Sequence, residues 1–265
     1  MMRSMLCTAK GSHPAISEDR YVRYLVMGYE ECLLWWDRHG RYYFHDKEDM
    51  ANFAGMQIEQ YLEHFLELWP GCEHAIIKEP WLTAHFPALA RLMKEALFVV
   101  MARDPRDIAV SLLKVGAKLE KKGQDNPHPR DDMERLGKYI HVSYTTLFRT
   151  PRRHWGGRLA WVRYERLVTD PQSVVRQIAA FTKLDLSAYD PVAAWPGWDD
   201  GTVESERLGG SYRSEFWGKP VTNERIGTWR EELTEDEAAI ILRETPDLVK
   251  LFGYGKENEK DRETA

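Results

Sequence analysis

The sequence predicts an α/β protein whose parallel sheet is covered by helices on both faces. Short apolar runs at residues 75–78, 97–102 and 159–164 have the length and composition of buried strands. The second and third runs lead directly into sequences that are typical of a helix start. Apolar strands that alternate with helices are characteristic of a parallel sheet between two helical layers.

The size and composition of the chain fit one folded domain. Its 265 residues, of which 43% are apolar and 12% aromatic, suffice for a sizeable core. We expect residues 1–255 to form a single domain and the charged run at 256–265 to be a disordered tail. The 37 Lys and Arg against 42 Asp and Glu give a formal charge of -5, which argues against nucleic acid as a partner.

The three cysteines, Cys7, Cys32 and Cys72, are scattered and form no Cys-x-x-Cys pair. This spacing predicts neither a disulfide framework nor a zinc site, and no other metal is expected. A reducing compartment, the cytoplasm, is the simplest interpretation. No apolar run approaches the length of a membrane span, and the first residues lack the apolar core of a signal peptide, so we expect no membrane span.

Residues 33–44 are rich in aromatic side chains, among them Trp35, Trp36, Tyr42 and Tyr43. Such a segment can form a small hairpin or the wall of an acceptor pocket, and it can equally belong to the ordinary core. The sequence leaves these alternatives open.

The most informative segment runs from residue 97 to residue 113. Arg103 stands at the carboxyl end of the predicted strand. Asp104 is expected to be the N-cap of the following helix, with Pro105 as its first residue and Asp107 three positions after the cap. Ligands of open α/β sheets collect at this edge of the sheet.

The side chains at this edge suit an anion. Arg103 offers a planar set of donors to a phosphate, and Ser111, two turns into the helix, adds a hydroxyl. The alternative is a structural arginine that pairs with Asp104 or Asp107, since most such charges are structural.

Two further blocks combine strand and helix signals. Residues 159–171 contain the predicted strand, the sequence Tyr-Glu-Arg-Leu from residue 164, and an Asp-Pro helix start whose helix extends to about residue 184. Residues 226–233 contain Gly-Thr-Trp-Arg. Thr234 and Glu237 then form a capping box that opens a C-terminal helix.

The three blocks resemble the sulfotransferase family, and most of all the tyrosylprotein sulfotransferases and their bacterial relatives. The family's 3′-phosphate-binding segment is an apolar strand, Arg-x-Pro-x-Asp and a helix with a serine, and Arg103, Pro105, Asp107 and Ser111 match it. The family's Tyr-Glu-x-Leu, Asp-Pro and Gly-x-Trp-Arg-x-x-Leu sequences follow in the right order. The resemblance implies a P-loop-like fold. It also implies a sulfuryl donor, 3′-phosphoadenosine 5′-phosphosulfate (PAPS), with 3′-phosphoadenosine 5′-phosphate (PAP) as the product.

One family element is not found. Sulfotransferases hold the 5′-phosphosulfate in a loop between a first strand and a helix, and here residues 1–14 resemble only that helix and the His-Pro after it. A start site placed too late or a shortened chain would explain this, and so would a natural chain that has lost donor activation. We expect the former, because a parallel sheet without its middle strand exposes apolar surface and unpaired edges.

The resemblance also implies roles for single side chains. Lys78 resembles the family's Lys-x-Pro lysine, which contacts the transferring group, while Arg103 and Ser111 would hold the 3′-phosphate. Tyr164 resembles the tyrosine that contacts adenine, and Ser214 resembles a serine that touches the phosphosulfate. For each of them the alternative is an ordinary structural or surface residue.

The acceptor proton needs a base, and family branches use either a histidine or a glutamate. We choose Glu18, which follows His13 and Pro14 as a glutamate does in the tyrosylprotein branch. The alternative is that Glu18 is an acidic residue at a helix N-terminus without a catalytic role. His13 is expected to order the turn before Pro14, and His85 to lie on a helix flank.

These observations predict a sulfotransferase that moves a sulfuryl group from PAPS to a hydroxyl or amine of a small-molecule, glycan or peptide acceptor by in-line transfer. Residues 21–71 and 118–157 carry no recognised motif and are expected to shape the acceptor cleft. The alternative is a non-catalytic module that binds PAP without the phosphosulfate loop. A nucleotide kinase is disfavoured, because no Gly-x-x-x-x-Gly-Lys-Ser/Thr loop is present.

Overall fold

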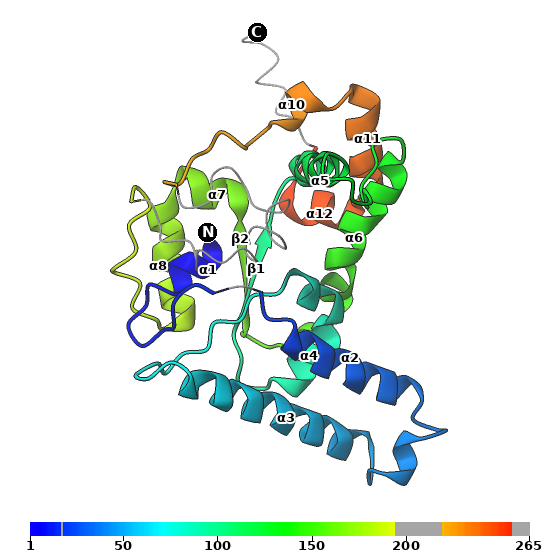
Figure 1. Ribbon diagram of the computed structural model, residues 1–265, viewed down its shortest axis with the longest axis vertical. Helices are drawn as coiled ribbons and strands as arrows, with labels where there is room; N and C mark the ends of the chain where they lie inside the picture. Colours follow the sequence, from blue (N-terminus) through cyan, green and yellow to red (C-terminus); the bar gives the residue numbers. More distant parts are fainter. Residues whose placement is uncertain (17, 194–218, 256–265) are drawn as a thin grey trace.

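The computed structural model of the protein describes residues 1–16, 18–193 and 219–255. In these ranges two parallel strands, β1 (Phe98–Ala102) and β2 (Leu159–Arg163), form a small sheet among helices (Figure 1). The register pairs Phe98 with Leu159 and Ala102 with Arg163. The predicted α/β class with a parallel sheet is confirmed.

Successive side chains of the strands point to opposite helical layers, as the pleat of a strand requires. Val99 and Val162 pack against one layer, and Val100 and Trp161 pack against the other. The helices of the first layer are α1 (Met2–Leu6), α7 (Tyr164–Thr169) and α8 (Pro171–Thr182). The helices that pack on the second face are α2 (Tyr21–Leu34), α3 (Lys47–Glu67) and α4 (Phe86–Leu92).

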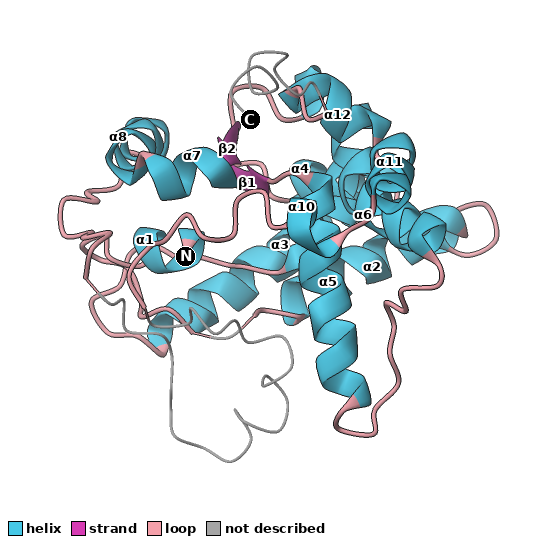
Figure 2. Cartoon of the chain, turned by 90° about the horizontal axis from the view of Figure 1, so that it is seen from above, coloured by secondary structure: helices cyan, strands magenta, loops and turns pink. Residues whose placement is uncertain are grey.

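A third cluster of helices lies beside the sheet, on the far side from α1 and α8 (Figure 2). Its members are α5 (Pro105–Glu120), α6 (Met133–Arg149), α10 (Trp229–Glu232), α11 (Glu235–Glu244) and α12 (Pro246–Phe252). Short 3-10 helices complete the described elements: η1 (Gly40–Tyr42), η2 (Pro80–His85) and η3 (Arg152–His154).

The predicted helix starts are confirmed by their caps. The Asp104 carboxylate accepts the Arg106 N–H at 2.9 Å and so opens α5. Thr234 and Glu237 form both bonds of the capping box at the start of α11. α8 ends two residues earlier than expected, because Lys183 adopts a left-handed conformation with φ of 63°.

The segment at residues 75–78 is not a strand, contrary to the prediction. Its backbone bonds go to the N-terminal part of the chain rather than to β1. The Ile76 N–H donates to Nε2 of His13 at 2.9 Å, and the Lys78 carbonyl accepts from the Asp19 N–H at 3.1 Å. An apolar run indicates burial, but it does not determine which groups will bond its backbone.

Residues 33–44 form no hairpin, so that alternative is wrong. α2 continues into this range, and turns and η1 follow. Trp36 and Phe44 pack against the core, whereas Tyr42 and Tyr43 are 68% and 81% exposed. The core interpretation therefore applies to two of the five aromatic residues in this segment, and the use of the segment as a pocket wall stays a prediction.

Candidate functional site

Arg103 lies immediately after β1, where the strand ends and the α5 cap begins. Its Nη2 donates to the carbonyl of Arg225 at 2.7 Å, and its guanidinium carbon lies 4.4 Å from the centre of the Tyr164 ring. Its Nε is buried and has no hydrogen-bond partner within the described ranges. A buried donor without a partner is costly, so this position favours an acceptor from outside the described residues.

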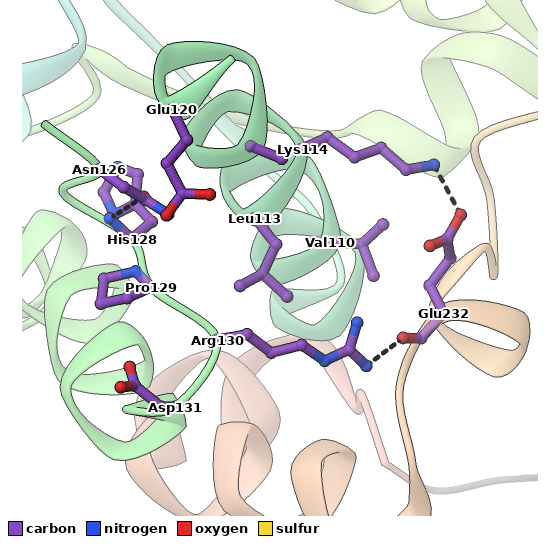
Figure 3. A pocket seen from close by; sticks show the side chains of 11 residues that line it. Val110, Leu113, Lys114, Glu120, Asn126, His128, Pro129, Arg130, Asp131 and Glu232 are labelled. Atoms are coloured by element: carbon purple, nitrogen blue, oxygen red, sulfur yellow. Dashed lines mark hydrogen bonds and ion pairs between the residues drawn. The ribbon is translucent and has the colours of Figure 1, made fainter. Parts of the chain in front are cut away.

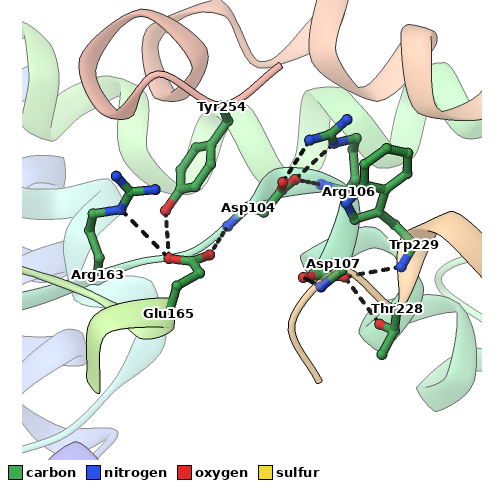
Figure 4. A network of polar contacts seen from close by, with 9 residues as sticks. Asp104, Arg106, Asp107, Arg163, Glu165, Thr228, Trp229 and Tyr254 are labelled. Atoms are coloured by element: carbon green, nitrogen blue, oxygen red, sulfur yellow. Dashed lines mark hydrogen bonds and ion pairs between the residues drawn. The ribbon is translucent and has the colours of Figure 1, made fainter. Parts of the chain in front are cut away.

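The two aspartates beside Arg103 have other partners, so the ion-pair interpretation is not what the structure shows. Asp104 pairs with Arg106 at 2.8 Å. Asp107 accepts from the backbone N–H groups of Gly227 and Trp229 at 2.8 and 3.1 Å (Figure 4). The second aspartate therefore joins the first and third sequence blocks.

A pocket of about 170 Å³ opens beside Arg103, and we call it the anion pocket. It brings together Arg103 and Ser111 from the first block with Lys114, one helical turn beyond Ser111, and Arg225 from the chain before α10. The described residues that line it are Arg103, Asp107, Val110, Ser111, Lys114, Glu224, Arg225 and Thr228. Two of the predicted nucleotide-binding residues thus share one pocket with two further cations.

Sequence reasoning missed Lys114 and Arg225. The signal for Lys114 was its spacing of three from Ser111 on the same helix, which places both side chains on one face. For Arg225 the only signal was its position two residues before Gly227. Neither spacing reveals that the segment before α10 folds back over α5.

Tyr164 begins α7 instead of ending the strand, one residue from where the prediction placed it. Burial raises the pKa of its phenol, and the positive charge of Arg103 opposes that rise. Beside it, the Glu165 carboxylate accepts from the Asp104 N–H at 2.8 Å and from the Tyr254 hydroxyl at 3.0 Å (Figure 4). These bonds fix the start of α7 to the end of β1, with the Tyr164 ring beneath Arg103.

Lys78 and Glu18, the two predicted catalytic residues, form an ion pair. Each side chain is somewhat less than half exposed, so the pair is reachable from solvent. The residues that follow them in the sequence, Asp19 and Glu79, make other contacts. Asp19 accepts from the N–H groups at the start of α2 and from the Tyr61 hydroxyl at 2.9 Å, and Glu79 is buried as the cap of η2.

The two histidines considered as bases are engaged elsewhere. His13 is fully buried, and its Nδ1 donates to the Pro14 carbonyl at 2.7 Å while its Nε2 accepts the Ile76 N–H. His85 Nδ1 lies 2.6 Å from a Glu30 oxygen. His13 therefore orders the turn at Pro14, as expected.

The comparison with known proteins decides the family. The model of the sulfotransferase family matches residues 12–188, more than half of the chain. The chain belongs to the sulfotransferase family. No curated protein matches it in sequence.

The family match spans Glu18, Lys78, Arg103, Ser111 and Tyr164. It ends before the segment with Arg225, which the structure nevertheless places in the anion pocket of this sulfotransferase. Ser214, the sixth predicted site residue, lies outside the described residues, as does the predicted tail at 256–265.

Two negative findings concern the described residues of this sulfotransferase. Within the described ranges there is no group of three His, Cys, Asp or Glu side chains placed to hold a metal ion. In the same ranges no helix has the length and apolar character needed to cross a bilayer.

Proposed function

We propose that this sulfotransferase uses PAPS and moves its sulfuryl group to a hydroxyl or amine of a small-molecule, glycan or peptide acceptor. The observation that carries the proposal is the convergence of Arg103 and Ser111 in one pocket at the carboxyl end of β1. Ligands of a parallel sheet bind at the carboxyl ends of its strands, and the cations at this edge suit a phosphate group.

The residues of the anion pocket fit the 3′-phosphate of PAPS. Arg103 retains a buried Nε–H without a partner among the described residues, and Ser111 supplies a hydroxyl within the same pocket. Arg225 adds positive charge beside Arg103, and Lys114, which pairs with Glu232 at 2.8 Å, lines the same pocket. The Asp107 carboxylate accepts from the backbone N–H groups of Gly227 and Trp229. The Tyr164 ring beneath Arg103 provides a flat surface for an adenine base.

The Glu18 and Lys78 pair supports the second half of the proposal. Bound PAPS would supply an activated sulfuryl group whose transfer builds negative charge on the leaving oxygen. The ammonium group of Lys78 can stabilise that charge, and the carboxylate of Glu18 can take the proton of the attacking hydroxyl or amine. Their direct contact keeps the proposed cation and the proposed base next to each other.

Titration calorimetry with PAP and with adenosine 5′-monophosphate tests the donor part of the proposal. We expect PAP to bind at one site, at least about tenfold tighter than the monophosphate, because only PAP carries the 3′-phosphate. Equal affinities would contradict the assignment of Arg103 and Ser111 to that phosphate.

Release of PAP from PAPS in the presence of phenols, sugars and amines, against a sample without acceptor, tests the transfer part. Acceptor-dependent release supports a sulfotransferase. Binding of PAP without any release supports the alternative, a module that binds the nucleotide and does not transfer sulfate.

A further inference from the structure

A second cavity, of about 450 Å³, lies on α5 next to the anion pocket (Figure 3). It is bounded by α5, by the chain between α5 and α6, and by Glu232 of α10. Of the described residues, it shares Val110 and Lys114 with the anion pocket. We call it the α5 cavity, and nothing in the sulfotransferase reaction described above makes use of it.

The floor of the α5 cavity is apolar. Val110, Leu113 and Ala117 line it from one face of the helix, and Pro129 lines it from the facing loop. A cavity of this size, with an apolar floor and a few polar groups at its rim, has the character of a small-molecule site.

The loop that closes the α5 cavity is fixed in place. Asn126 accepts the His128 N–H at 2.8 Å and donates to the Glu120 carboxylate at 2.8 Å. It packs so closely on α5 that a Cβ atom at Gly116 would lie 2.1 Å from its side-chain oxygen. The cavity is therefore preformed, and a ligand need not order it.

The cations at the rim are already neutralised. Arg130 donates through Nε and Nη2 to Glu237 at 2.8 Å and to the Glu232 carbonyl at 2.6 Å. Lys114 pairs with the Glu232 carboxylate at 2.8 Å. Among the described residues that line the cavity, the cations Lys114 and Arg130 thus both have a carboxylate partner.

Two carboxylates at the rim, in contrast to the cations, have no partner of opposite charge among the described residues. Within the described ranges neither Glu120 nor Asp131 forms an ion pair, and the one bond that the structure gives Glu120 is from the neutral Asn126 amide. Unpaired negative charge beside an apolar floor favours a ligand that carries a positive charge on an apolar body.

We propose that the α5 cavity binds a primary amine with a small apolar group. The ammonium group would lie at Glu120, and the apolar group would cover Leu113 and Ala117. Binding of the amine in this cavity does not require the nucleotide, so the proposal stands whether or not the protein transfers sulfate.

Calorimetric titration with 2-phenylethylamine, with its neutral analogue 2-phenylethanol as the comparison, tests the proposal. We expect the amine to bind one site and the alcohol to bind at least about tenfold more weakly, since the alcohol cannot pair with Glu120. Equal binding of the two compounds, or no binding of the amine, would overturn the proposal.

Three variants locate the site. E120Q keeps the bond from Asn126 and removes the charge, so it should weaken amine binding at least about tenfold. A117W should abolish binding by filling the cavity, and because Ala117 is exposed the substitution leaves the core intact. E231Q removes the same charge on α10 from a residue that does not line the cavity, and it should bind like the parent protein. Equal weakening in E231Q and E120Q would show attraction to overall charge and overturn the site.

Discussion

The Asp107 carboxylate lies 2.8 Å from the backbone nitrogen of Gly227, 120 residues further along the chain. It also accepts from the Thr228 hydroxyl and from the Trp229 N–H, each at 3.1 Å. Asp107 is 1% exposed, and Trp229 packs in the core with Arg106 over its ring. One carboxylate thus holds the segment that brings Arg225 to the anion pocket.

Replacement of Asp107 by alanine should destabilise the protein by about 2–4 kcal/mol, because it leaves buried donors at Gly227 and Trp229 without an acceptor. Urea unfolding measures this loss. Asp125 is exposed and outside this network, so D125A should change the free energy of unfolding by less than about 0.5 kcal/mol. A similar loss in both variants would contradict the anchoring role.

Much of the fold could be predicted because its signals are local. Asp104 and Thr234 cap the helices where the sequence places them, and both long apolar runs are strands. The strand prediction for residues 75–78 failed because the hydrogen-bond partners of this segment lie at His13 and Asp19, and no local sequence pattern contains that information. Apolar composition reports burial, while pairing is a property of the whole chain.

In the candidate site, too, some residues could be predicted from the local sequence and others could not. Arg103 and Ser111 could be predicted, since one strand and one helix of a continuous segment place them. Lys114 had a local signal in its spacing from Ser111, but Arg225 could not be predicted, because its position depends on the contact between Asp107 and Gly227. The role of Asp107 itself was hidden, since at the third position of a helix an aspartate is already explained by the helix start.

Replacement of Arg103 by alanine should weaken PAP binding by about 1.5–3 kcal/mol, roughly 10- to 150-fold, as expected for lost charged hydrogen bonds. Calorimetry measures the change, and R103K tests whether the planar group is needed. Arg149, an exposed arginine at the end of α6, provides the control R149A. Unchanged affinity in R103A would remove Arg103 from the phosphate site.

Replacement of Lys78 by alanine should lower kcat by about 10²-fold and change the Kd of PAP by less than about threefold, because its charge acts on the leaving oxygen in the transition state. Steady-state rates of PAP release and calorimetry separate the two effects. A loss of PAP affinity as large as the loss in kcat would make Lys78 a binding residue.

Replacement of Glu18 by glutamine should lower kcat by about 10²–10⁴-fold with the Kd of PAP unchanged, because the amide cannot accept the acceptor's proton. E59Q, at an exposed position of α3, should retain the parent rate. D19N should lower thermal stability rather than kcat, since Asp19 caps α2 and accepts from Tyr61. Parent-like kcat in E18Q would assign the proton to another base.

His13 should make the stability of the protein depend on pH. Burial lowers the pKa of its imidazole from the ordinary 6.5, because the charged form loses its hydration in the interior. The folded contact needs the neutral form, since Nε2 accepts the Ile76 N–H. Burial and the nearby Arg135 lower the pKa of His128 in the same direction.

The direction in which the free energy of unfolding changes with pH follows from the lower pKa of the folded state. Below about pH 6.5 the unfolded chain binds a proton at His13 that the folded protein excludes. The stability that comes from the neutral, buried histidine is therefore fully present above that pH and is lost as the pH falls towards the pKa of the folded state. Each histidine contributes a slope of at most about 1.4 kcal/mol per pH unit. Urea unfolding between pH 8 and 5.5 should therefore show a falling free energy of unfolding below pH 6.5, and H13Q should show a shallower fall. An identical slope in H13Q would mean that His13 does not exclude the proton.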